Sequence, residues 1–540
     1  MSEALGTTSL TPVMTPEQIE IMKWIIEGVG HAVVIARAGT GKTWTALRGM
    51  RLMLPARACI AMFNRPIADE TRGKLAADEI NGDSVTFHSA GWTALRQAYP
   101  KCKLSGTGPQ KAGFDKWDRI VEIMATQGNE IPAFYQKFAQ KAVSMAKQRA
   151  FGLATPRLKD PTIFAHWLKL VEDFDLDGLI PEEIFDLQLE MGNDRDTVIK
   201  NGLRHAARAL IRSNELLEIV ADHDDQIYGP LIKNVQFKVT YDWLIIDEAQ
   251  DSNPARRLLA RKMLRPNGRA LFIGDPAQAI YAFTGADNDA MDAIIAEWKA
   301  TVLKLTTTFR CPKLVVRMAQ EFVPDYRAAE TNIEGEYHNL SNDDFYKEFA
   351  PKLTPDTVVL CRNTAPLVQT AFKLIANNIP CRVIGKEIGG QLVELVNRWK
   401  SVKTMTTFKE KLRNYAETQT AKLMEVNKER QADVLNDRVD TVFAVIGGMA
   451  ADATLNDLKA KIDEMFPKSE KGVEQKKMVR LMTAHRAKGL EEDTVVILGR
   501  KELFPSKYAT KPEQLVQENN LEYVAITRTK RVLIDVKMAA

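Results

Sequence analysis

The feature that most constrains this chain is the octapeptide Ala-Arg-Ala-Gly-Thr-Gly-Lys-Thr at residues 36–43. The apolar run before it, residues 32–35, predicts a buried strand. Apolar side chains recur at helical spacing over residues 44–54, which predicts a helix after it. A strand, a glycine turn, Gly-Lys-Thr and a helix in this order predict a loop that binds phosphate. Ala36 stands where the general pattern has its first glycine, and the alternative is an ordinary glycine-rich turn.

The residues of this phosphate loop have distinct expected roles. Glycines permit the turns that bring backbone N–H groups around phosphate oxygens, and the helix N-terminus adds a favourable partial charge. Lys42 would reach the β- and γ-phosphates of a nucleotide, and the Thr43 hydroxyl would bind Mg²⁺. The other positions expected at the nucleotide are Ala38, Gly39, Thr40 and Gly41.

Composition narrows the class of protein. The 540 residues predict several domains, and 45% hydrophobic and 27% charged residues are ordinary for a globular protein. A net charge of +4 is compatible with a nucleic-acid partner but is weak support for one. The five scattered cysteines argue against zinc sites, iron–sulfur clusters and disulfides. The sequence shows no signal pattern and no apolar run of membrane length, so we expect a soluble, intracellular protein without a membrane partner.

The first predicted helix lies shortly before the phosphate loop. Thr15 is its expected N-cap and Pro16 its first residue. Gln18, in the first turn, either reads the adenine edge of a bound nucleotide or belongs only to a well-made helix start.

Two further predicted strands end in candidate ligand contacts. Residues 58–62 lead to Phe63 and Asn64, and a third short strand ends in Thr86-Phe87-His88-Ser89. Ligands of parallel α/β sheets bind beyond the carboxyl ends of the strands. A ring there can stack on an unpaired base, and hydroxyl and imidazole groups can hold phosphates. For Phe87 we favour a place in the core, and for Phe63 stacking and core packing both stay open.

The alternation of strands and helices stops between about residues 92 and 224, where helical patterns dominate. We interpret this stretch as a helical domain inserted into the sheet domain. Its first part is basic and aromatic, and solvated helix faces explain this better than a nucleic-acid contact does. The residues in question are Lys101, Lys103, Lys111, Lys116, Trp117 and Arg119.

The sheet resumes with a predicted buried strand at residues 243–246, followed by Asp247 and Glu248. Asp247 would hold Mg²⁺ through water, and Glu248 would orient or deprotonate the attacking water. A further strand, residues 270–273, leads to Gln278, which would sense the γ-phosphate. Tyr281 and Phe283 follow it and offer faces for base stacking.

Taken together, these segments resemble the successive motifs of superfamily 1 DNA helicases of the UvrD/Rep/PcrA type. The resemblance covers most of both motor domains and is most specific in the late segments. The matching segments are residues 36–43, 63–64, 86–89, 247–251, 274–281, 305–312, 360–363, 481–491 and 523–528.

The resemblance implies further site residues. Arg310 and Arg528 would stabilise charge on the γ-phosphate from the second motor domain, so that hydrolysis depends on closure of the cleft between the motors. Phe309 would pack on adenine, and Glu491 would contact the nucleotide sugar. The implied contacts with nucleic acid add Arg362, Thr483 and His485 to Phe63, Asn64, Thr86, His88, Tyr281 and Phe283.

The chain departs from the family pattern in three places. Thr284 replaces a common arginine, Trp44 replaces a common basic residue, and the second helical insertion is short. We therefore expect a compact variant, similar to phage-encoded or F-box-associated relatives, without a C-terminal nuclease or partner-docking domain.

The predicted fold class is α/β, with two RecA-like parallel-sheet motor domains of the phosphate-loop NTPase type, each carrying a mainly helical insertion. The expected first motor is residues 1–92 and 225–300, with insertion 93–224. The expected second motor is residues 301–390 and 480–540, with insertion 391–479.

The resemblance implies an ATP- and Mg²⁺-dependent DNA helicase that moves 3′-to-5′ on single-stranded DNA and opens single-strand/duplex junctions in replication, repair or recombination. Three alternatives stay open. They are a translocase that displaces proteins or drives a defence or repair complex without robust unwinding, a nucleotide-gated nucleic-acid binder without turnover, and an RNA-directed motor. We expect the cytoplasm of a bacterium or phage-infected host and possible replication or repair partners. The oligomeric state is open, with a monomer as the working assumption.

Overall fold

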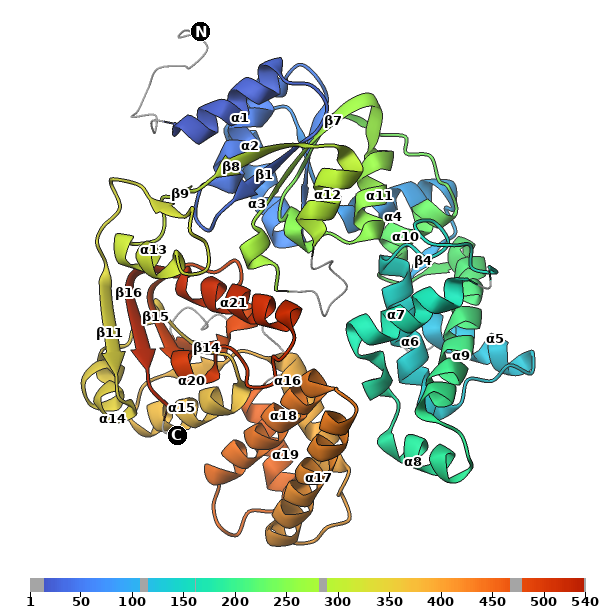
Figure 1. Ribbon diagram of the computed structural model, residues 1–540, viewed down its shortest axis with the longest axis vertical. Helices are drawn as coiled ribbons and strands as arrows, with labels where there is room; N and C mark the ends of the chain where they lie inside the picture. The colour runs from blue at the N-terminus through green and yellow to red at the C-terminus, as the bar shows by residue number, and fades with distance from the viewer. Residues whose placement is uncertain (1–13, 107–114, 161, 281–288, 467–477, 539–540) are drawn as a thin grey trace. The chain divides into compact units, whose positions relative to one another are not determined.

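The computed structural model describes residues 14–106, 115–160, 162–280, 289–466 and 478–538 (Figure 1). The chain divides into two compact units. The first consists of residues 1–36, 41–276 and 281–306, and the second of residues 37–40, 277–280 and 307–540. The division runs through the phosphate loop, because residues 37–40 belong to the second unit while Gly41, Lys42 and Thr43 belong to the first.

The first unit is built on a sheet of six parallel strands, which confirms the α/β prediction for this part of the chain. Each strand expected between residues 32 and 273 is present, and β7 begins six residues earlier than expected. In spatial order the strands are β3 (Asp83–Thr86), β2 (Ala58–Met62), β6 (Tyr241–Ile246), β7 (Leu264–Gly274), β1 (Ala32–Ala36) and β8 (Thr301–Leu305).

Helices cover both faces of this sheet (Figure 1). One face packs on α1 (Pro16–Glu27), α2 (Lys42–Met53) and α3 (Arg65–Ala77), through a core that includes Val34 and Ile245. The other face packs on α4 (Phe87–Ala98), α10 (Asp225–Ile232), α11 (Pro254–Met263) and α12 (Ala290–Trp298). Thr15 caps α1 as expected: its hydroxyl accepts from the N–H of Gln18, and the Gln18 side chain accepts from the N–H of Thr15.

The third strand ends earlier than expected. It stops at Thr86, whose side chain accepts a hydrogen bond from the N–H of Ser89, and the Ser89 hydroxyl accepts from the N–H of Thr86. This reciprocal cap starts α4 at Phe87, so Phe87 and His88 lie in a helical turn. Phe87 is buried in the core, as predicted.

The predicted helical insertion is present and has its own hydrophobic core. Its chain ends are tied by a short parallel pair, β4 (Lys103–Leu104) with β5 (Val220–Ala221). Its helices are α5 (Lys116–Thr126), α6 (Ala133–Gln148), α7 (Ile163–Phe174), α8 (Glu182–Glu190) and α9 (Arg195–Glu215).

The interpretation of Lys116 as part of a solvated helix face is wrong. Its side chain is 1% exposed, and its Nζ lies 2.5 Å from Asp225 Oδ2. Lys147 is equally buried, 2.8 Å from Asp225 Oδ1, and also bonds Asp222. Carboxylates at the start of α10 supply the charges that these amines need in the interior, which the local sequence around Lys116 does not show.

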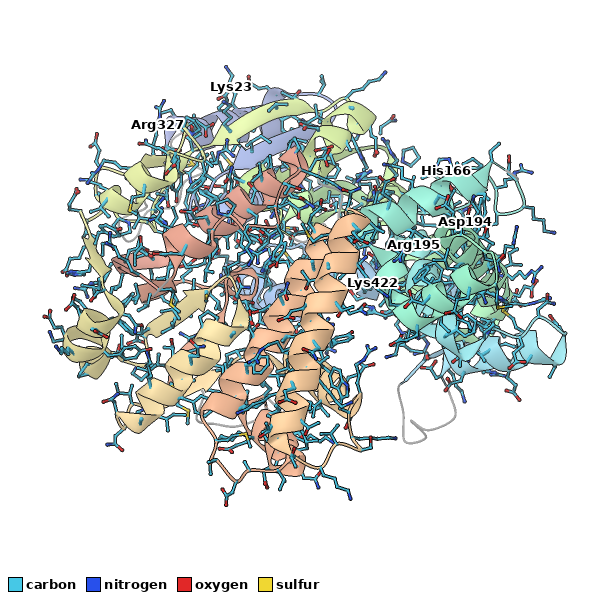
Figure 2. The ribbon with its side chains drawn as sticks, turned by 60° about the horizontal axis from the view of Figure 1, so that its bottom comes forward. Lys23, His166, Asp194, Arg195, Arg327 and Lys422 are labelled. Carbon is cyan, nitrogen blue, oxygen red and sulfur yellow. The ribbon has the colours of Figure 1, made fainter. Side chains whose placement is uncertain are left out.

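Ion pairs of Arg195 connect helical segments of the insertion. Asp194 caps α9, and the neighbouring Arg195 pairs with Asp177 at 3.3 Å and with Glu182, on α8, at 2.9 Å (Figure 2). Its guanidinium also lies 3.8 Å from the ring centre of Phe185.

The second unit contains another six-stranded parallel sheet, again as predicted. In spatial order its strands are β11 (Glu336–Leu340), β16 (Thr529–Val536), β15 (Glu492–Leu498), β12 (Thr357–Cys361), β14 (Val479–Thr483) and β13 (Cys381–Val383). A separate two-stranded pair joins β9 (Thr307–Thr308) to β10 (Arg327–Ala328).

Helices of the second unit include a helical insertion between β13 and β14. Its described helices are α16 (Lys386–Asn397), α17 (Met405–Glu425), α18 (Glu429–Gly447) and α19 (Leu455–Met465), and Thr454 caps α19. The remaining helices are α13 (Lys313–Ala319), α14 (Asn342–Asp344), α15 (Thr364–Ala376), α20 (Arg500–Leu503) and α21 (Pro512–Ile526). Among the helices of the described ranges, none combines the length and the apolar character needed to cross a bilayer.

Candidate functional site

The phosphate loop leaves β1 after Ala36 and enters α2 at Lys42. Gly39 and Gly41 both have left-handed backbones, with φ of +66° and +79°, which residues with a Cβ rarely adopt. Gly41 is the N-cap of α2 and supplies no side-chain hydrogen bond to the first helical turn. The helix therefore presents an uncapped N-terminus at the loop, as an anion-binding site requires.

Lys42 lies beside the two carboxylates that follow β6. Its Nζ is 3.8 Å from Glu248 Oε1. The same amine is buried and has no hydrogen-bond partner among the described residues. An ammonium group without hydrogen bonds in the interior is costly, so this position suits the oxygens of a bound phosphate.

Asp247 is 8% exposed and accepts a hydrogen bond from the N–H of Glu248 at 2.9 Å. Burial, and then the neighbouring charge of Glu248, raise the pKa of Asp247 to about 6, although Lys42 opposes them. Two adjacent carboxylates with one nearby cation fit a divalent metal ion, which would restore the charged form of Asp247. Asp247 and Thr43 are the residues that would hold Mg²⁺, with phosphate oxygens and water completing its shell.

Gln250 is a site residue that sequence reasoning missed. Its amide nitrogen donates to Glu248 Oε2, and its Oε1 accepts from the N–H of Asp275 at 3.0 Å. It thus connects the ends of β6 and β7 and fixes the Glu248 carboxylate. The signal in the sequence is its position inside the segment Asp-Glu-Ala-Gln-Asp, which directly follows a predicted strand.

Gln18 lies close to the phosphate loop. A Cβ at Gly41 would be 3.7 Å from Gln18 Nε2, which itself donates to Thr45 Oγ1 at 3.3 Å. Trp44, in the first turn of α2, carries the Arg48 guanidinium 5.4 Å from its ring centre.

The first unit also brings predicted nucleic-acid contacts near the carboxylates. Phe63 and His88 line a small cavity together with Asp247 and Glu248. Phe63 is 37% exposed, and the Arg256 guanidinium lies 4.9 Å from its ring centre. Its ring is therefore available at one face and supported at the other.

His88 packs against His223, with the ring centres 4.1 Å apart. Burial, followed by the charges of His223 and Arg256, lowers the pKa of His88 to about 3, so the imidazole is neutral at neutral pH. A neutral imidazole contacts phosphate through a hydrogen bond rather than a charge. Asn64 and Thr86 cap α3 and α4, so both predicted contact residues also have structural roles.

In the second unit, the two predicted arginines are held by partners of that unit. Arg310 bonds Glu491, while its Nε is buried without a hydrogen-bond partner among the described residues. Arg528 is 1% exposed and donates to the carbonyl of Val524 at 2.9 Å and to Gln278 Oε1 at 3.3 Å. Burial, and then the charge of Arg310, lower the pKa of Arg528 to about 10.

Residues 277–280 follow β7 but belong to the second unit. Lys488 donates to the carbonyl of Gln278 at 2.8 Å, and Asn520 donates to the carbonyl of Ala279 at 3.2 Å. Gln278 is therefore fixed by both its side chain and its backbone. Phe309, the predicted adenine contact, is 48% exposed.

Arg362 is engaged by acidic residues. It lies 2.6 Å from Glu518 and 2.7 Å from Asp433. Burial opposes its charge, but the hydrogen bond and charge of Glu518 outweigh burial and raise its pKa. Arg362 would have to leave Glu518 and Asp433 in order to contact nucleic acid.

The other two predicted contacts of this unit are His485 and Thr483. Burial, followed by the charge of Arg362, lowers the pKa of His485 to about 4, and Thr483 is half-buried at the end of β14.

The stacking residues Tyr281 and Phe283, and also Thr284, lie outside the described residues.

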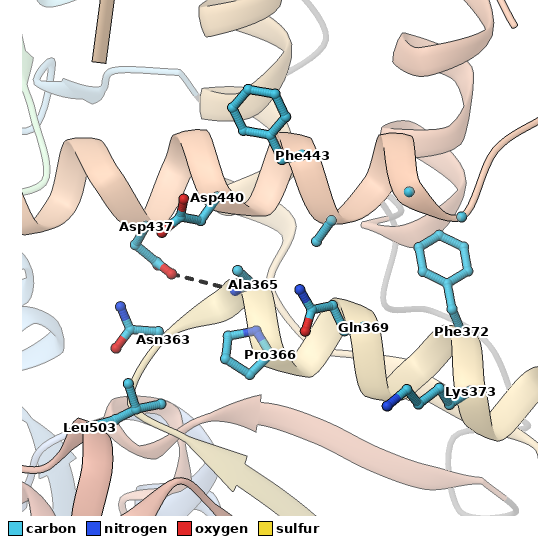
Figure 3. Close-up of a pocket in the computed structure, with 13 residues that line it drawn as sticks. Asn363, Ala365, Pro366, Gln369, Phe372, Lys373, Asp437, Asp440, Phe443 and Leu503 are labelled. Atoms are coloured by element: carbon cyan, nitrogen blue, oxygen red, sulfur yellow. Dashed lines mark hydrogen bonds between the residues drawn. The ribbon is translucent and has the colours of Figure 1, made fainter. Parts of the chain in front are cut away.

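A groove of about 580 Å³ lies between α15 and α18 in the second unit (Figure 3). Phe372 and Phe443, one on each helix, line it, and Asp437 accepts a hydrogen bond from the N–H of Ala365 at 3.4 Å. The groove is larger than the cavity at Asp247, but none of the predicted nucleotide residues lines it. Two carboxylates, Asp437 and Asp440, line it against one lysine, Lys373, and this balance does not favour a phosphate.

Comparison with known proteins identifies two family domains. Residues 14–299 match the UvrD/REP helicase N-terminal domain, and residues 390–537 match the UvrD-like helicase C-terminal domain. DNA helicase II of Haemophilus influenzae is 23% identical, over 94% of this chain and 81% of its own length. F-box DNA helicase 1 of Gallus gallus is 24% identical, over 98% of this chain but only 49% of its own length. A probable DNA helicase II homolog of Mycoplasma genitalium is 22% identical, over 55% of this chain and 54% of its own length.

Proposed function

This chain belongs to the UvrD-like family of DNA helicases, and on that premise we propose that it couples ATP hydrolysis to 3′-to-5′ movement on single-stranded DNA and to unwinding of adjoining duplex. It is an ATP-driven DNA helicase with two RecA-like motor domains. The observation that carries the nucleotide assignment is the buried Lys42 amine, without a hydrogen-bond partner in the described ranges, next to two carboxylates.

Phosphoryl transfer to water needs positioning and charge stabilisation more than covalent chemistry. We assign the β- and γ-phosphates to Lys42 and to the backbone of the phosphate loop, including Ala38, Gly39, Thr40 and Gly41. Bound Mg²⁺ would neutralise charge that develops on the phosphates. Glu248, held by Gln250, would orient the attacking water and accept its proton.

The remaining nucleotide contacts are assigned by the same reasoning. Arg310 and Arg528 would deliver cations to the γ-phosphate, since a guanidinium fork suits its oxygens. Their present partners, Glu491 and Gln278, are themselves proposed to contact the sugar and the γ-phosphate. When nucleotide binds, the two arginines would therefore exchange these partners for phosphate oxygens, and the released side chains would contact the nucleotide. Few buried polar groups would be left without a hydrogen bond. Gln18 and Phe309 are the proposed adenine contacts.

Single-stranded DNA is the proposed track. Phe63 would stack on bases. The proposed contacts with the DNA backbone are Asn64, Thr86 and His88 in the first unit, and Arg362, Thr483 and His485 in the second unit. Stacking contributes about 1–3 kcal/mol per base and tolerates any sequence. The cavity shared by Phe63, His88, Asp247 and Glu248 supports a direct connection between this track and hydrolysis.

Unwinding of partial duplexes with either a 3′ or a 5′ single-stranded tail tests the proposal. We expect ATP-dependent strand release from the 3′-tailed substrate, and none with Lys42→Ala. Release only from the 5′-tailed substrate would contradict the direction, and ATP-independent release would contradict the motor.

A second candidate is a translocase without robust unwinding. The described part of the second insertion contains only four helices, α16–α19, which favours testing this function. Displacement of a tightly bound protein from single-stranded DNA, measured beside strand release, separates the two functions. Matched DNA and RNA oligonucleotides in an ATPase assay would establish which nucleic acid stimulates turnover.

A further inference from the structure

The first half of the phosphate loop is held by residues of the second unit to which no role has been assigned. Asp325 Oδ1 accepts from Arg37 Nε at 2.9 Å. The Tyr523 hydroxyl accepts from the N–H of Ala38 at 3.1 Å, and the Tyr326 hydroxyl donates to the carbonyl of Ala38 at 2.7 Å. The N–H of Phe309 donates to the carbonyl of Gly39 at 2.9 Å. We call Asp325, Tyr326 and Tyr523 the loop collar.

The two tyrosines hold the two peptide groups on either side of the Ala38 Cα. Both are fully buried, and their rings meet edge to face with centres 6.0 Å apart. Burial, and then the neighbouring Cys311 thiol, raise the pKa of Tyr326 well above its usual value, which keeps the hydroxyl protonated as a donor. Buried hydroxyls with defined partners and packed rings hold the Ala38 backbone in one place.

Each collar tyrosine is also connected through local backbone structure to one of the predicted arginines. Tyr523 lies in the last turn of α21, and its carbonyl accepts from the N–H of Thr527, the residue before Arg528. Tyr326 immediately precedes β10, which pairs with β9, and Arg310 follows β9 by two residues. A Cβ at Gly39 would lie 2.5 Å from the Cβ of Arg310, so the loop and this arginine are already in close contact.

We propose that Tyr326 and Tyr523 are positioning residues for ATP hydrolysis. They hold the phosphate loop at Ala38 and thereby fix its position relative to Arg310 and Arg528. This inference rests on the proposed ATP site. The two collar tyrosines contact the loop backbone at Ala38, whereas Lys42, at the other end of the loop, is the residue proposed to contact the phosphates. Loss of a collar hydroxyl therefore lowers the rate of turnover more than it weakens nucleotide binding.

The test uses Tyr326→Phe and Tyr523→Phe in the full chain, because phenylalanine keeps the ring packing and removes only the hydroxyl. Single-stranded-DNA-stimulated ATPase gives kcat and KM, and equilibrium binding of a fluorescent ADP gives nucleotide affinity. We expect kcat to fall about tenfold in each variant, which corresponds to about 1.4 kcal/mol in the barrier. Nucleotide affinity should change by less than about twofold. The double variant should lose less than the product of the single effects, because both hydroxyls act on one residue, Ala38.

Tyr135→Phe is the matched control. Tyr135 is also buried, and its hydroxyl donates to the carbonyl of Val198 at 2.7 Å within the helical insertion. It carries the same chemical change and the same kind of lost hydrogen bond, and its kcat should equal that of the wild type. Asp325→Asn, at a half-buried position, provides a variant that folds even if a tyrosine variant does not, and it should lower kcat about threefold.

Three results overturn the inference while the wild type still hydrolyses ATP. They are collar variants with the kcat of the wild type, equal losses of kcat in the collar variants and the Tyr135→Phe control, or a loss confined to nucleotide affinity. A wild-type protein without DNA-stimulated hydrolysis, or Lys42→Ala with normal hydrolysis, would instead refute the proposed function.

Discussion

Replacement of Asp247 by asparagine is expected to stabilise the folded protein while abolishing hydrolysis. The pKa of this buried carboxyl rises from an ordinary 3.8 to about 6 on folding, first through burial and then through Glu248. At about 1.4 kcal/mol per pH unit, the charged form costs the folded state at most about 3 kcal/mol near pH 7.5. Asparagine has nearly the same shape and carries no charge, so it removes this cost.

The sign of the pH dependence follows from the raised pKa. The wild-type carboxyl contributes stability below its unfolded pKa of 3.8 and loses that contribution as the pH rises through about 6. The advantage of Asp247→Asn should therefore be largest at about pH 7.5 and fall to about half of that at about pH 5. Urea unfolding of the wild type and the variant at both pH values, without Mg²⁺ or nucleotide, measures it. Added Mg²⁺ and nucleotide should stabilise the wild type more than the variant.

Asp242→Asn, near the start of the β6 strand that Asp247 follows, is the control. Asp242 is near the surface and accepts from the N–H of Arg57 at 2.8 Å and from Arg265 at 2.8 Å. The hydrogen bond from Arg57, and then that from Arg265, lower its pKa, so this carboxylate adds stability at neutral pH. Its loss should be mildly destabilising, opposite in sign to Asp247→Asn. A destabilised Asp247→Asn variant at about pH 7.5, or a gain that does not change with pH, would refute the electrostatic reasoning.

Three further substitutions test separate parts of the molecule. Lys42→Ala should abolish phosphate release in a steady-state assay, and retained DNA-stimulated turnover would refute the loop assignment. Arg528→Ala should lower turnover by about 10³-fold with a much smaller change in nucleotide affinity, and a defect found only in equilibrium binding would argue against its role. Lys116→Met should lower the free energy of unfolding by about 3 kcal/mol, because Asp225 keeps only Lys147 as a buried cation, and an unchanged urea midpoint would exclude this.

The two sheets could be predicted because their signals are local. Apolar runs such as residues 58–62 and 243–246 are bounded by turns or polar residues, and each became a strand with boundaries within two residues of those expected. The third strand shows where local patterns fail. Thr86 and Ser89 form a reciprocal cap, and this competes with continued strand and starts a helix at Phe87.

The site was only partly accessible from sequence. Lys42, Asp247 and Glu248 follow strands in a recognisable order, and the structure brings them together. The sequence does not predict the role of Gln250, because this role depends on β6 and β7 being neighbours, a pairing that sequence alone does not give. The prediction for Lys116 is wrong for a similar reason, since its partner Asp225 lies 109 residues further along the chain.

The loop collar marks a more basic limit of sequence reasoning. Tyr523 accepts from the N–H of Ala38 and Tyr326 donates to its carbonyl, and these are groups that almost every residue possesses. The recognised position therefore carries no side-chain signal, and Ala38 gives no hint that it is held on both sides. A tyrosine whose partner is backbone reads in sequence as an ordinary core aromatic. Only the buried hydroxyl, which must find a partner to avoid the cost of desolvation, separates its function from that of phenylalanine, and for this reason the phenylalanine variants are the decisive comparison.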